Sequence, residues 1–156
     1  MKNVLLFCLL LVVFSCSKEN RGVIINLEDE VALNKIKKLE LDTKYKNLLN
    51  AQLTTAKEYE TVMKSWSGFH TQVGKILKEN NFDWEVRDSA VKILNKIYFN
   101  KDGEINYMAF KVMNESVTDD KKEAYKKILS DNVSKLTIAL ERNEQYAQCG
   151  KVKYVN

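Results

Sequence analysis

Apolar residues recur at three- and four-residue spacing over residues 41–80, which is the period of one face of a helix. They are Leu41, Tyr45, Leu48, Leu49, Leu53, Ala56, Tyr59, Val62, Met63, Trp66, Phe69, Val73, Ile76 and Leu77. The spacing predicts helical structure that ends near Asn80. A glycine inside a helix costs about 1 kcal/mol relative to alanine, and Ser67 can cap a second helix beside Gly68. Two segments, or one helix kinked at Gly68, are therefore slightly favoured over one straight helix.

After residue 82 the apolar period changes from 3.6 to 2, which is typical of strands. Val91, Ile93, Ile97 and Phe99 point to one side. The segment Asn100-Lys101-Asp102-Gly103 reads as a turn, with glycine where a positive φ is needed. Ile105 to Val112 then returns as a second strand. The sequence thus predicts a β-hairpin.

The remaining residues predict one helix and two further strands. Ser116 or Thr118 can cap a helix whose apolar face contains Tyr125 and Leu129. Residues 136–140 alternate as a third strand, and residues 145–155 as a last one. The expected fold class is α+β: a helical part over 41–81, then a ββαββ antiparallel sheet over 86–156 with one covering helix. We expect residues 41–156 to form a single domain.

Residues 16–40 have no clear period. Ser17 to Asn26 is polar except for Val23, Ile24 and Ile25, and a weakly phased helix start follows at Asn26. We therefore expect residues 16–40 to serve as a tether and lead-in to the domain.

The first residues carry the most specific pattern in the chain. Lys2 precedes an unbroken apolar run of 11 residues, Val4 to Phe14. A membrane-spanning helix needs roughly 20 apolar residues, so this run fits a secretory signal, residues 1–15. The run ends at Val13-Phe14-Ser15-Cys16, and a plain signal peptide or a buried apolar segment is the alternative.

Val13-Phe14-Ser15-Cys16 resembles the bacterial lipobox, most like that of Bacteroidota. The resemblance implies acylation of the Cys16 thiol, cleavage before it, and a mature protein held at the membrane by its lipid. The expected location is the cell envelope, on the periplasmic face of the outer membrane rather than the cell surface. The short charged segment after Ser17 has few of the acids of a surface-export signal.

Net charge and cysteine count exclude some kinds of binding partner and a fold held together by disulfides. Loss of residues 1–15 would remove one of the 25 basic residues and none of the 21 acidic ones, leaving a formal charge of +3 in place of +4. This balance is too mild to indicate nucleic acid binding, which needs a concentrated basic surface. Of the three cysteines, Cys8 leaves with the signal and Cys16 is acylated, so Cys149 has no disulfide partner. We expect Cys149 to be a partly buried strand residue.

The sequence offers little catalytic chemistry. There is one histidine, His70, and no phosphate-binding glycine loop, Cys-x-x-Cys or Gly-x-Ser-x-Gly motif. We expect neither catalytic residues, nor a metal site, nor a cofactor, and a protein that is not an enzyme. The expected role is binding another envelope protein or a structural one. An inhibitor or immunity-type lipoprotein with an acidic or aromatic patch on its sheet is the first alternative. A ligand binder or enzyme with a closed pocket around Trp66, His70 and Trp84 is the second.

Two further motifs resemble known families. Phe99-Asn100-Lys101-Asp102-Gly103-Glu104-Ile105 is similar to the strand and Asp-Gly turn of the periplasmic C-terminal module of TonB-type energy transducers. Over residues 91–156 this resemblance implies a hairpin, a helix and a closing strand, although that family's proline before the last strand is missing. Asp88-Ser89-Ala90 is similar to the O-glycan acceptor of Bacteroidota envelope proteins, which implies Ser89 as the acceptor.

Overall fold

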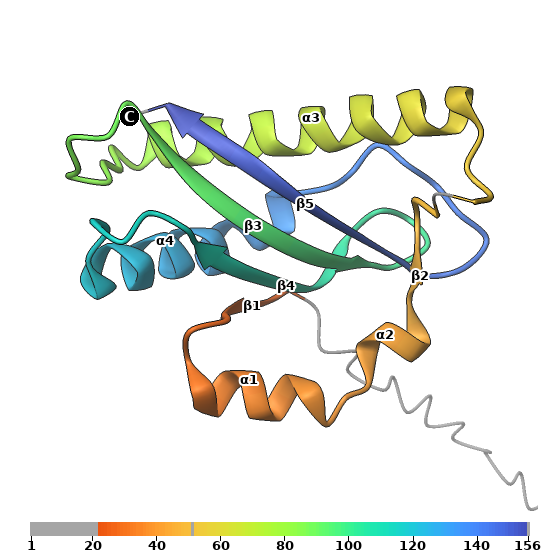
Figure 1. Cartoon of the computed structure of the whole chain (residues 1–156), viewed down its shortest axis with the longest axis horizontal. Coiled ribbons are helices and arrows are strands. Elements are labelled where there is room, and N and C mark those ends of the chain that lie inside the picture. The colour runs from red at the N-terminus through yellow and green to blue at the C-terminus, as the bar shows by residue number, and fades with distance from the viewer. Residues whose placement is uncertain (1–21, 51, 156) are drawn as a thin grey trace, which may run out of the picture.

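A computed structural model describes residues 22–50 and 52–155 (Figure 1). These residues form a five-stranded mixed sheet with helices on both sides. The helices are α1 (Glu30–Lys37), α2 (Leu41–Lys44), α3 (Ala56–Glu79) and α4 (Asp119–Asn132), the last continued by a 3-10 turn, Val133–Lys135. The strands are β1 (Val23–Asn26), β2 (Lys46–Asn47), β3 (Ala90–Phe99), β4 (Ile105–Val112) and β5 (Tyr146–Val155).

The strands lie in the order β1-β4-β3-β5-β2. The three long central strands are antiparallel: β3 pairs with β4 on one side and with β5 on the other. The two short edge strands are parallel to their neighbours, β1 to β4 and β2 to β5. The α+β class is therefore confirmed, but the sheet is mixed and not antiparallel throughout.

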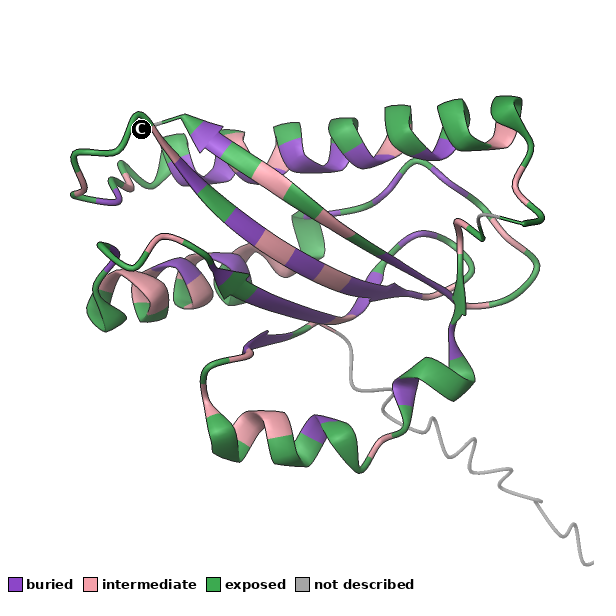
Figure 2. Cartoon of the chain, in the orientation of Figure 1, coloured by how far each residue is buried: buried purple, intermediate pink, exposed green. Residues whose placement is uncertain are grey.

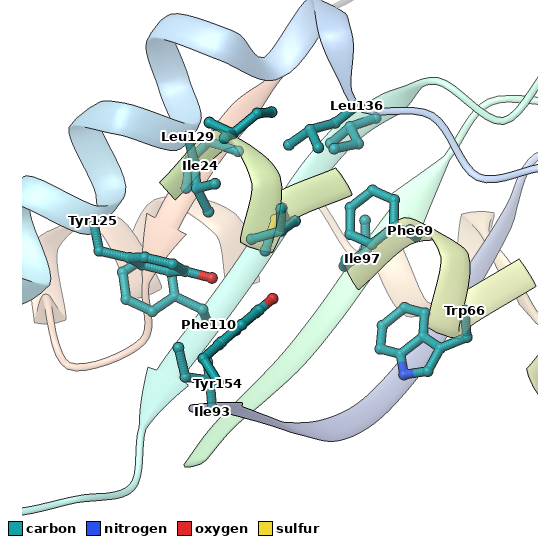
Figure 3. Packing of buried hydrophobic residues seen from close by; sticks show 14 of the residues in the cluster. Ile24, Trp66, Phe69, Ile93, Ile97, Phe110, Tyr125, Leu129, Leu136 and Tyr154 are labelled. Atoms are coloured by element: carbon teal, nitrogen blue, oxygen red, sulfur yellow. The ribbon is translucent and has the colours of Figure 1, made fainter. Parts of the chain in front are cut away.

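Helices α3 and α4 cover one face of the sheet. The main core lies between these two helices and the sheet (Figure 3). Alternation along β3 turns Val91, Ile93, Ile97 and Phe99 into this core, each with 0% exposure. On α4, Tyr125 packs against Phe110 of β4 with ring centroids 5.0 Å apart. Burial of this apolar surface is the main favourable contribution to folding.

Helices α1 and α2 cover only part of the opposite face (Figures 1 and 2). Ile36 of α1 and Leu41 of α2 join a second, smaller cluster with Tyr98 of β3 and Ala147 of β5. Tyr45 and Tyr98 meet edge to face at 5.2 Å between ring centroids. The rest of this face, over β3 and β5, has no helix in front of it in Figure 1.

The helix α3 is continuous through Gly68, so the expected break or kink there is wrong. It also begins at Ala56 and not near residue 41, because Thr55 caps it by accepting a hydrogen bond from the Glu58 N–H at 3.2 Å. Thr55 and Glu58 have the spacing of a capping box, the local signal that marks this start. The predicted end is confirmed: Asn80 is the C-cap, and Asn81 adopts a left-handed φ of 50°.

Residues 136–140 are irregular, with a bend at Ala139, and are not the expected third strand. Leu136, Ile138 and Leu140 are buried, which explains the alternation. One isolated bridge, from Thr137 to Glu104, joins this segment to the hairpin. Both edges of β3 are occupied, and the Gln72 side chain of α3 instead hydrogen-bonds the Thr137 carbonyl and N–H at 2.9 and 3.2 Å. A helix side chain thus satisfies backbone groups that a strand would pair.

Val23–Asn26 form a strand and not the expected tether, whereas the weak helix expected after Asn26 is present as α1. Val23 to Asn26 pair with Tyr107 to Phe110 of β4, and Ile24 and Ile25 are buried on opposite faces. Asp29 caps α1 by accepting a hydrogen bond from the Ala32 N–H at 3.0 Å. The short apolar run was too brief to show a period, but it supplies an edge strand. Residues 16–21 lie outside the described residues.

The hairpin β3–β4, the helix α4 with Thr118 as its cap, and the closing strand β5 are confirmed. In the turn, the Asn100 side chain accepts hydrogen bonds from the N–H groups of Asp102 and Glu104 at 3.0 and 2.9 Å. Gly103 has a φ of +85°.

Two glycines with opposite environments test this description. A Cβ at Gly103 would overlap the Ile138 carbonyl oxygen in a left-handed conformation, whereas a Cβ at Gly68 would meet no atom within 4 Å. Gly103→Ala should lower the free energy of unfolding by about 2 kcal/mol or more. Gly68→Ala should raise it by about 0.5 to 1 kcal/mol. Urea denaturation measures both, and a loss of stability for Gly68→Ala would contradict a continuous α3.

Candidate functional site

The most distinctive exposed feature is the part of the sheet that α1 and α2 leave uncovered. The strand registers place two rows of side chains there, Met113-Lys92-Lys153 and Lys111-Leu94-Lys151. A third row, Ala109-Lys96-Cys149, lies at the border with α1 and α2, where Ala109 is buried. We call the five lysines of these rows, Lys92, Lys96, Lys111, Lys151 and Lys153, the lysine face. In Figure 2 the exposed stripes of β5 mark this side of the molecule.

Among the described residues, Lys96 is the lysine of this face with a carboxylate within ion-pair distance, while Lys92 acts on Asp88 only by longer-range attraction. The Lys96 ammonium lies 2.7 Å from the Asp42 carboxylate of α2, which also accepts a hydrogen bond from the Tyr98 hydroxyl at 2.8 Å. Chiefly through its hydrogen bond with Lys96, this arrangement lowers the pKa of Asp42. The other four lysines make no ion pair with any carboxylate in the described part of the chain.

The lysine face includes a like-charged cross-strand pair. Lys92 of β3 and Lys153 of β5 are direct partners in the antiparallel register, so both side chains lie on one face of the sheet. Like charges in this position destabilise a sheet, while an opposite charge would stabilise it. The fold therefore keeps its positive charge here at some cost in stability, as functional surfaces commonly do.

Charge reversal at Lys153 tests this description. Lys153→Glu should raise the free energy of unfolding by about 0.5 to 1 kcal/mol, because attraction to Lys92 replaces repulsion. Lys153→Gln, which only removes the repulsion, should give a smaller gain. Urea denaturation at low salt measures both, and the gain should shrink at high salt because salt screens exposed charges. A loss of stability in Lys153→Glu would refute the repulsive pair.

Trp66 and His70 lie one helical turn apart on the buried face of α3. Their ring centroids are 4.4 Å apart, and the His70 Nδ1 is 2.8 Å from the Tyr154 hydroxyl of β5. Trp66 also packs over Gly150, where an added Cβ would lie 3.0 Å from the indole nitrogen. These contacts fix α3 to the closing strand.

Burial decides the charge of His70. Its side chain is 6% exposed, and desolvation lowers its pKa to about 4. The imidazole is therefore neutral in the folded protein at pH 7, and its Nε2 atom has no hydrogen-bond partner among the described residues. A histidine in this setting serves packing, since solvent cannot reach it to exchange protons with a substrate.

The lowered pKa of His70 makes the stability of the folded protein depend on pH. Because the folded pKa lies below the unfolded value of about 6.5, unfolding takes up a proton between these values. This contribution is fully present above pH 6.5 and is lost as pH falls towards 4, by about 2 kcal/mol at pH 4.5. His70→Gln should be less stable at pH 7 but should lose less stability on acidification. Urea denaturation from pH 7 to 4.5 measures this, and equal pH slopes in both proteins would contradict the buried neutral histidine.

The closed pocket that a ligand binder or enzyme would show around Trp66, His70 and Trp84 is not found in the described part of the chain, because these three rings are packed in the core. Trp84 is 3% exposed and packs against Phe82 and Tyr125, with ring centroids 4.8 and 5.1 Å apart. An open depression of about 650 Å³ runs along α3 instead, lined in part by Lys57, Lys64 and Ala139. The sheet patch expected of an inhibitor is also different, since the uncovered face is basic.

The remaining candidate residues lie apart from this core. Cys16 is outside the described residues. Ser89 is exposed in the segment before β3, next to Asp88, which accepts hydrogen bonds from Asn114 and Ser116 at 2.7 and 3.0 Å. Cys149 is on β5 as expected, but it is exposed on the uncovered face and not partly buried. Sequence reasoning missed the lysine face because total charge does not show which lysines a sheet register brings together.

The described residues hold neither a metal-binding cluster nor a membrane-spanning helix. No three His, Cys, Asp or Glu side chains of residues 22–50 and 52–155 are grouped as a metal site requires. None of the helices in this part of the chain has both the length and the apolar character to cross a bilayer.

No family model, curated protein or solved structure matches the chain.

Proposed function

We propose that this chain is a bacterial envelope lipoprotein, anchored through an acylated Cys16, whose α+β domain acts by binding and not by catalysis. The observation that carries the proposal is Val13-Phe14-Ser15-Cys16 at the end of an 11-residue apolar run with Lys2 before it. That run is too short to span a bilayer, and it places a cysteine where the lipid-transfer reaction of such signals needs it.

The position of the domain relative to Cys16 supports an anchored arrangement. The first described residue, Gly22, donates a hydrogen bond from its N–H to the Ile105 carbonyl at 2.9 Å. The described part of the chain thus begins six residues after Cys16. The proposed location is the periplasmic face of the outer membrane.

A binding or structural role agrees with the distribution of side chains. The only histidine of the sequence is enclosed in the core as a neutral imidazole. The clearest surface feature is the lysine face, and exposed charge concentrated on one side is typical of recognition surfaces. We therefore favour contact with another envelope component over chemistry on a small substrate.

The anchor is tested by substitution of its cysteine. Cys16→Ser should abolish incorporation of labelled fatty acid and move the protein from the membrane fraction to the soluble fraction, or stop its processing. Cys149→Ser is the matched control, because it removes the exposed thiol of β5 and should leave labelling unchanged. Lipid labelling of the Cys16→Ser protein in cells would refute the proposal.

A further inference from the structure

We propose that the lysine face docks on the anionic lipid headgroups of the bilayer to which the chain is anchored. Five ammonium groups lie on three neighbouring strands, and four of them have no ion-pair partner among the described residues. Each lysine near an anionic bilayer strengthens binding about fivefold. A shared sheet face presents such groups side by side.

The opposite side of the molecule differs in charge pattern. On α4, Lys126 pairs with Glu123 at 3.1 Å, and Lys127 with Asp131 at 2.6 Å. On α3, Lys75 lies 3.7 Å from Glu79. These helices carry both signs of charge in neighbouring positions, so their fields largely cancel. The three rows of the lysine face, by contrast, contain lysines and no acidic residue.

Apolar groups at one end of the lysine face suit the same occupant. Met113, in the row of Lys92, is 43% exposed, and Val155, two residues after Lys153, is 85% exposed. Lysine stems can lie along such apolar surface while the ammonium groups remain among polar headgroups. A bilayer interface offers anionic and apolar contacts together.

Distance favours the bilayer over an acidic protein. This part of the inference rests on the proposed function, because it requires an acylated Cys16. The six residues from Cys16 to Gly22 then span at most about 20 Å. The domain then stays close to the membrane surface at all times. Electrostatic attraction acts over a Debye length of about 8 Å at physiological salt, so modest tilting brings the face into range. Such tethering raises the effective concentration of the lipid surface without any new contact.

Vesicle binding of the unlipidated protein tests the inference. The chain from residue 16 with Cys16→Ser keeps every described element of the fold. It is mixed with vesicles of phosphatidylcholine alone or with one third phosphatidylglycerol, and binding is measured by co-sedimentation at low and high salt. We expect binding to the anionic vesicles only, weakening as salt shortens the Debye length from about 10 Å at 0.1 M to about 3 Å at 1 M.

A matched pair of variants assigns the binding to the lysine face. Lys151→Glu with Lys153→Glu should weaken partitioning at least about 25-fold, from about fivefold for each lysine. Lys57→Glu with Lys64→Glu makes the same charge change on exposed residues of α3, on the other side of the sheet, and should change binding by less than about threefold. Urea denaturation should show that the first variant is at least as stable as the parent chain.

Equal binding to both vesicle types would overturn the inference, and so would an equal loss of binding in both double variants. Polyglutamate serves as a probe for an acidic protein. The inference would also fail if the first variant lost binding to polyglutamate while its vesicle binding stayed unchanged. That outcome would assign the face to an acidic protein partner. Because these vesicles test a chain without lipid, their result is independent of fatty-acid labelling at Cys16. Failure of the anchor and failure of the docking face are thus distinguishable.

Discussion

The pairing of β3 with β5 is the contact on which the rest of the fold depends. All ten residues of β3, from Ala90 to Phe99, have a partner on β5, which is almost the last segment of the chain. Because β5 closes the sheet, it also provides the edge for β2 and the surface on which Trp66 of α3 packs. The free energy of this long-range pairing has to offset the entropy of closing the intervening chain.

This pairing also creates two faces of opposite character. Odd-numbered residues of β3 enter the core under α3 and α4, while even-numbered ones share the other face with Lys151 and Lys153. A shift of one residue in register would bring the lysines into the core, so burial of the apolar face fixes the position of the charged one. The uncovered lysines are thus held in a defined geometry by the packing behind them.

Local signals were sufficient where an element is long or has a specific cap or turn. The Asn100 to Gly103 turn and the alternation on either side of it defined the hairpin, and the two candidate caps, Ser116 and Thr118, placed the start of α4 to within two residues. Reasoning from period failed for residues 136–140 because an irregular segment that packs under a helix can show the same alternating burial as a strand. The expected break at Gly68 was wrong for a different reason. The free-energy cost of one solvent-facing glycine is small compared with the free energy gained by packing a 24-residue helix on the sheet.

The sequence by itself determined the α+β class, the hairpin, the helix α4 and the lipobox-like cysteine, because each depends on residues close together in the chain. Tertiary structure decided the parallel edge strands, the burial of His70 and the exposure of Cys149. It also decided that five lysines from three strands share one surface. Those features arise from contacts between distant segments, which composition and local period do not record. The charged face in particular follows from strand register, which the buried side of the sheet sets.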